Sequence, residues 1–160
     1  MKGTPMSETV SKNVVSFEKL LTMEGFDLGF TEYRTITQEQ INLFADATDD
    51  HQWLHTDVER ATAGPFGAPI AHGYLTLSLA IPFWTELLDV EGVTSKVNYG
   101  LEKVRFISPV LVNSRIRMNG VIASITEIKG GVQLGVDQTI EIEGGAKPAA
   151  IAHGLYRFYN

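Results

Sequence analysis

Hydrophobic positions follow two different periods along this chain, and the period changes near residue 97. Beyond that point apolar and polar residues alternate, which is typical of strands with one buried face. Glycine-rich or proline-containing segments separate the alternating stretches and predict chain reversals. The expected strands cover residues 101–107, 114–125, 132–143 and 149–158. The second half of the chain should therefore form a long antiparallel sheet.

Residues 73–87 form the most apolar stretch of the first half, with apolar side chains on every side of a predicted helix. A helix of this kind is buried by the elements around it. It should begin at His72 or Gly73, and Pro82 should kink it because proline has no N–H to donate. A central helix followed by four long strands predicts an α+β fold in which the sheet curls round the helix.

Shorter elements are expected before this helix. Thr37 should cap one helix and Asp57 another, because each precedes a stretch with helical spacing. The predicted elements are a helix over 14–23, a strand over 26–36, and helices over 38–47 and 58–63. Residues 1–12 are small and polar and predict a flexible tail, which leaves a single domain over residues 13–160.

Composition narrows the classes of function. The chain carries 13 basic and 19 acidic side chains, a net charge of −6 that argues against a nucleic-acid-binding surface. It has no cysteine, which excludes disulfides, thiolate nucleophiles and cysteine-ligated metals. The longest apolar run is too short to span a membrane, and the N-terminus lacks the apolar core of a signal peptide. A soluble, cytoplasmic protein is expected.

The stretch from Asp49 to His55 concentrates polar groups that could do chemistry. It places the carboxylate of Asp50 five residues before the imidazole of His55. Taken alone, these residues favour a turn aspartate bonded to backbone N–H groups and a half-buried histidine bonded to a carbonyl. An acid–base pair is the alternative reading.

A metal site is a second alternative for the same stretch. His51 and His55 lie four residues apart, the spacing of two ligands on one helical face, and Asp49 or Asp50 would complete a triad. However, Gln52 stands where a zinc protease has its glutamate, and no strong helical signal covers residues 50–55. No metal is expected.

Three motifs together resemble the MaoC-type (R)-specific enoyl-CoA hydratases. They are Asp50-x-x-x-x-His55 with apolar Leu54, Ala71-His72-Gly73 at the start of the buried helix, and the strand-ending stretch 104–110. The resemblance covers residues 28–125 and implies a hot-dog fold, usually dimeric, with a long helix wrapped by an antiparallel sheet.

This sequence departs from the commonest family pattern at two places. Gln52 and Trp53 replace an asparagine and a proline, which resembles a branch described as NodN-like. Ile81 stands where some members carry a serine, so a role for that hydroxyl is absent here. Both departures leave Asp50 and His55 intact.

The resemblance implies hydration of trans-2-enoyl-CoA to (3R)-3-hydroxyacyl-CoA. Such a reaction needs a base, an acid and a group that holds the developing enolate oxygen. Asp50 and His55 would flank the water, and the backbone N–H of Gly73 at a helix N-terminus would bind the thioester carbonyl. No cofactor is implied, since coenzyme A is part of the substrate. His72 and His153 are expected to be structural.

Two other functions compete with hydration. One is a hot-dog acyl-CoA thioesterase, and the other is an acyl-thioester-binding subunit without turnover. The sequence also leaves open which cations meet the phosphates of coenzyme A. The eligible residues are Lys96, Lys103, Arg105, Arg115 and Arg117.

Overall fold

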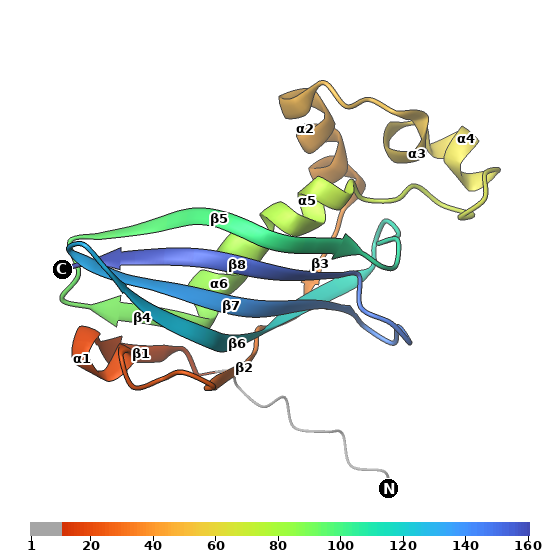
Figure 1. Ribbon diagram of the computed structural model, residues 1–160. Coiled ribbons are helices and arrows are strands. Elements are labelled where there is room, and N and C mark those ends of the chain that lie inside the picture. Colours follow the sequence, from red (N-terminus) through yellow and green to blue (C-terminus); the bar gives the residue numbers. More distant parts are fainter. Residues whose placement is uncertain (1–10) are drawn as a thin grey trace, which may run out of the picture.

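The computed structural model describes residues 11–160 and contains one large antiparallel sheet wrapped round a helix (Figure 1). Neighbouring strands in the sheet run in the order β2-β6-β7-β8-β5, and β3 adds to β6. The strands are β2 (Asp27–Phe30), β3 (Arg34–Thr35), β5 (Ser95–Phe106), β6 (Arg115–Ile128), β7 (Gly131–Ile142) and β8 (Ala150–Tyr159). The four strands predicted from alternation are confirmed, and so is the fold class.

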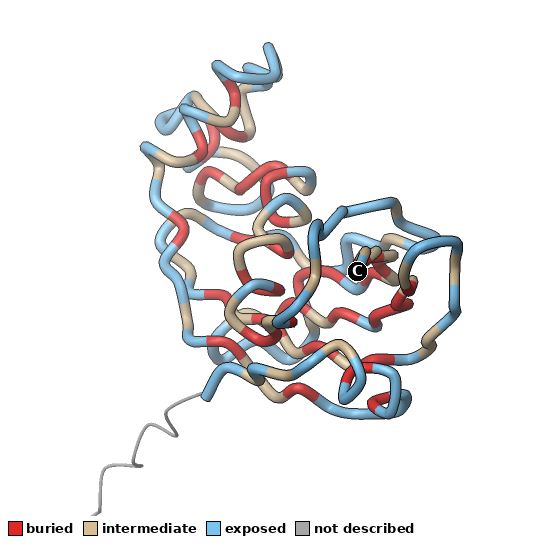
Figure 2. The backbone as a smooth tube through the Cα atoms, turned by 90° about the vertical axis from the view of Figure 1, so that its left-hand side faces the viewer, coloured by how far each residue is buried: buried red, intermediate tan, exposed pale blue. Residues whose placement is uncertain are grey.

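The central helix consists of α5 (Gly73–Ser78) and α6 (Ala80–Leu87), with an interruption at Leu79. The interruption lies just before Pro82, which cannot donate to the carbonyl of Ser78. Phe83 and Leu87 are fully buried against the sheet, and each contributes about 1.5–3 kcal/mol of burial free energy. Buried positions run through the centre of the molecule, between the exposed outer loops (Figure 2).

The prediction that this helix is covered on every side is wrong. Tyr74 is 70% exposed, and Ser78 and Thr85 are exposed on the same helix. The sheet curls round one side of the helix, so the other side stays open to solvent. The open side begins next to Gly73, the residue that the sequence assigns to the oxyanion site.

The N-terminal prediction of one helix over 14–23 needs correction. Residues Asn13–Ser16 form a strand, β1, that pairs in parallel with β4 (Leu88–Glu91), and only Phe17–Leu20 are helical (α1). The side chain of Asn13 donates to the Leu87 carbonyl at 2.9 Å, which ties β1 to the end of α6. The strand predicted over 26–36 is also divided, into β2 and β3. The predicted tail lies outside the described residues, except for residues 11 and 12.

Three short helices precede the central one and project beyond the sheet near the start of α5 (Figure 1). They are α2 (Gln38–Thr48), α3 (Trp53–Thr56) and α4 (Val58–Thr62). Both predicted caps are confirmed, since Thr37 accepts from the Gln40 N–H and Asp57 from the Arg60 N–H. The helix α3 was not predicted. Its four residues carry too little periodicity to be recognised.

Across residues 11–160, every helix is too short or too polar to cross a membrane.

Candidate functional site

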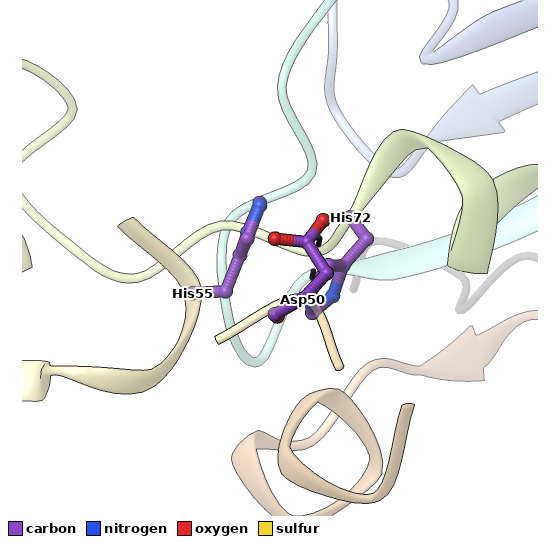
Figure 3. A group of neighbouring side chains, drawn as sticks. All are labelled: Asp50, His55 and His72. Atoms are coloured by element: carbon purple, nitrogen blue, oxygen red, sulfur yellow. Dashed lines mark hydrogen bonds and ion pairs between the residues drawn. The ribbon is translucent and has the colours of Figure 1, made fainter. Parts of the chain in front are cut away.

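Asp50, His55 and His72 come together at the open end of the central helix (Figure 3). Asp50 follows α2, which ends where Asp49 adopts a left-handed conformation with φ 58°. His55 lies in α3, and His72 directly precedes α5. One ring nitrogen of each histidine and one carboxylate oxygen of Asp50 lie within 4.8 Å of one another. Three separate segments therefore supply one cluster.

The contacts of His55 favour the neutral form of its ring. Its Nδ1 lies 2.7 Å from the carbonyl oxygen of Ile70, and a carbonyl only accepts, so Nδ1 carries the proton and Nε2 keeps its lone pair. Burial lowers the pKa of His55 below 6.5, and the charge of His72 adds to that effect. The Ile70 carbonyl and the Asp50 carboxylate oppose it. The net direction favours the unprotonated ring at neutral pH.

His72 contacts both of the other residues in the cluster, which its local sequence does not predict. Its Nε2 donates to the backbone carbonyl of Asp50 at 2.9 Å, and its ring stacks on His55 with centroids 3.8 Å apart. Phe44 packs on it from α2 at 5.0 Å. It is 2% exposed, and its Nδ1 is buried with no hydrogen-bond partner among the described residues. These contacts position the backbone of Asp50 and the ring of His55, the two residues proposed to do chemistry.

The carboxylate of Asp50 is about half exposed and lies close to both rings. Its Oδ2 lies 3.9 Å from the Nε2 of His72. The 4.8 Å limit on the cluster is shorter than the roughly 5.6 Å that two hydrogen bonds through one water can span. A single water molecule can therefore contact the carboxylate and a ring nitrogen together.

Gly73 is the first residue of α5, so its N–H has no acceptor within the helix. A Cβ at this position would lie 2.9 Å from the Phe106 ring, so any side chain here would displace that ring. Gly73 also lines a hollow of about 300 Å³, whose walls include Ile70, Thr76 and Phe106. The residue that carries the proposed oxyanion donor thus borders a hollow.

The His51–His55 pairing considered from sequence is not formed. The side chain of His51 is exposed and bonds Asp46 at 2.8 Å, a contact that raises the pKa of His51. The alternative ligand set, Asp50 with His55 and His72, places two imidazoles in a stack tilted by 26°. One nitrogen of each ring already bonds a backbone carbonyl, that of Ile70 for His55 and that of Asp50 for His72, which leaves one nitrogen of each ring for an ion.

Comparison with known proteins is consistent with this geometry. Residues 21–145 match the family model described as "MaoC like domain". The chain is 47% identical to 3-hydroxyacyl-thioester dehydratase Z of Mycobacterium tuberculosis over 89% of this chain and 95% of that protein. It is 39% identical to Nodulation protein N of Rhizobium meliloti over 88% and 89%.

A solved structure shows the same fold. It is an (R)-hydratase from A. caviae involved in PHA biosynthesis, with a TM-score of 0.68 at 22% identity over 83% of this chain and 94% of that one. At that identity the likeness supports the hot-dog fold and nothing finer. The family match and the two sequence relatives show that this chain belongs to the MaoC-like dehydratase family.

Proposed function

We propose that this protein adds water across the double bond of trans-2-enoyl-CoA, giving (3R)-3-hydroxyacyl-CoA, and catalyses the reverse dehydration. The observation that carries the proposal is that a carboxylate oxygen of Asp50 and a ring nitrogen each of His55 and His72 lie within 4.8 Å of one another, directly before the helix that Gly73 begins. The relative named as a 3-hydroxyacyl-thioester dehydratase supports the reaction class. The (R) configuration rests on the family resemblance.

In this mechanism the unprotonated Nε2 of His55 accepts a proton from a water that Asp50 also holds. The water oxygen attacks C3 of the enoyl group, and the electron pair of the double bond moves toward the thioester carbonyl. The Gly73 N–H donates to the resulting enolate oxygen at the positive end of the helix. The Asp50–His55 pair then returns a proton to C2, so that one water has been added.

The partner we propose is a second copy of this chain, joined through β5. This strand lies at the edge of the sheet and exposes apolar side chains at Val97, Tyr99 and Leu101. An exposed apolar edge strand is a template for pairing with another chain. Sedimentation of the purified protein as a monomer at micromolar concentration would contradict this assembly.

The test is hydration of crotonyl-CoA by Asp50→Asn, followed as loss of absorbance of the conjugated double bond. Removing an acid–base partner should lower turnover by about 10²–10⁴-fold. Asp49→Asn is the matched control, because asparagine tolerates the left-handed conformation of that residue. Near-normal hydration by Asp50→Asn would overturn the mechanism, and release of free thiol by the wild type would indicate a thioesterase instead.

A further inference from the structure

Three of the five cations that could meet coenzyme A already pair with carboxylates. Lys96 contacts Asp89, Arg115 bonds Glu143 at 2.7 Å, and Arg117 bonds Glu141 at 3.1 Å. Among the described residues, Lys103 and Arg105 have no acidic partner. The structure thus reduces the candidates to two neighbouring cations on β5.

Both cations line a hollow of about 460 Å³ on the outer face of the sheet, away from α5 and α6. Lys103 lies opposite His153 of β8 in the strand register, and Arg105 lies opposite Ile151. We call this the outer hollow. The acidic residue that lines it, Asp137, bonds His153 Nδ1 at 2.7 Å. With two cations and one carboxylate, the outer hollow therefore carries net positive charge, which favours an anion.

The outer hollow and the hollow beside Gly73 are lined by neighbouring residues of the same two strands. The last residue pair of β5 and β8 is Phe106 with Ala150, and the Phe106 ring contacts Gly73 from the inner face. The hollow at Gly73 is lined by Phe106 and Ala149, whereas the outer hollow is lined by Arg105 and Ile151. A flexible chain that starts at a thioester on Gly73 can round this end of the strand pair and reach the cations.

We propose that Lys103 and Arg105 bind the phosphate groups of coenzyme A while the thioester lies at Gly73. The inference rests on the proposed function, because it needs a CoA thioester in the site. Guanidinium and ammonium groups bind phosphate by charge-assisted hydrogen bonds, and arginine does so with a planar fork of donors. In a chain with a net charge of −6, two neighbouring cations without a carboxylate partner among residues 11–160 favour an anionic ligand, although Arg105 also donates to the Val104 carbonyl.

The experiment compares two substrates that share one reacting group. Crotonyl-CoA carries the phosphates, and crotonyl-pantetheine lacks them. The variant Lys103→Gln/Arg105→Gln should raise KM for crotonyl-CoA by about tenfold or more and leave KM for crotonyl-pantetheine unchanged. The matched control is Lys129→Gln/Lys147→Gln, which removes the same charge from two exposed lysines outside the outer hollow.

Equal changes in KM for both substrates, or no change for either, would overturn the proposal. If the wild type hydrates neither substrate, the proposed function fails but the phosphate site is still decided by titration calorimetry with coenzyme A itself. Weaker binding to the variant than to the control would support the site. Equal binding to both would refute it, whatever the reaction.

Discussion

The chain contains the tripeptide Ala-His-Gly twice, and the two copies have different surroundings. His72, in the first copy, is 2% exposed, donates to a backbone carbonyl and stacks on a second histidine. His153, in the second copy, lies mid-strand on the outer face and bonds the exposed carboxylate of Asp137. The local sequence is identical, so the difference between them comes from the tertiary structure.

The comparison shows what makes a histidine useful in this protein. The first copy lies at the start of α5. Asp50, which follows the end of α2, and His55, which lies in α3, both approach it there. The second lies in β8, between β7 and β5, where a side chain meets its cross-strand neighbours. Chemistry that needs several converging groups is therefore favoured at the first copy.

The largest contrast is expected between alanine substitutions at Gly73 and Gly154, which should affect turnover and stability differently. Gly73→Ala places a methyl group 2.9 Å from the Phe106 ring, at the proposed oxyanion donor. Phe106 is about half exposed and can move aside, so stability should change little. The thioester would be displaced, and a displacement near 1 Å can cost about 10²-fold in turnover. Hydration kinetics with crotonyl-CoA and urea denaturation measure the two effects.

Gly154→Ala is the matched variant on the second tripeptide. It should lower stability and leave turnover unchanged. Its methyl group would meet Gln138 Oε1 at 3.0 Å and the Tyr156 ring at 2.9 Å, both in the buried core. Overpacking there should lower the free energy of unfolding by about 1–3 kcal/mol while the folded enzyme keeps its turnover. Loss of turnover in Gly154→Ala without loss of stability would contradict the view that only the first tripeptide serves the reaction.

The sequence predicted those parts of the fold that depend on local patterns, such as alternating burial or a bond to a residue nearby in the chain. Strands β6 and β7 alternate because one face is buried, and Thr37 and Asp57 cap helices through bonds three residues away. Strand β1 escaped prediction because it is four residues long and pairs with β4, which follows more than seventy residues later. A pattern of local period carries no information about such a partner.

The same limit applied to the candidate site. Asp50, His55 and Gly73 were named from motif resemblance, and the structure brings the first two within reach of one water. The contacts of His72 were missed because they depend on a ring stack with a residue from another segment. The outer hollow was missed because Lys103 and Arg105 differ from the other three candidate cations in making no salt bridge among the described residues, which no linear pattern reveals.

A smaller contrast is expected when the histidines themselves are removed. His72→Ala opens a buried space, removes the donor to the Asp50 carbonyl and should cost about 1–3 kcal/mol of unfolding free energy. His153→Ala removes a partly exposed pair with Asp137 and should cost about 0.5 kcal/mol or less. Denaturant titration of both variants decides it. Equal losses of unfolding free energy in the two variants would mean that the buried contacts of His72 stabilise the fold no more than the exposed pair of His153 does.

The smallest effect expected is a pH dependence that separates His55 from its neighbour His51. Burial lowers the pKa of His55 below 6.5, so the unfolded chain binds the proton more readily, and stability should fall as pH drops from 6.5 through the folded-state pKa. The bond to Asp46 raises the pKa of His51 above 6.5, and its contribution is present below 6.5 and lost as pH rises through the raised value.

The measurement is the unfolding free energy of the wild type, His55→Ala and His51→Ala from about pH 8 to about pH 5. It separates the pH dependence of stability due to His55 from that due to His51. Relative to the wild type, His55→Ala should lose less stability on acidification and His51→Ala should lose more, although the latter change is small because His51 is exposed. The acid limb of kcat/KM for crotonyl-CoA should lie below pH 6.5, since the base must be unprotonated. An acid limb above 6.5 would mean that the group accepting the proton is not the buried ring of His55.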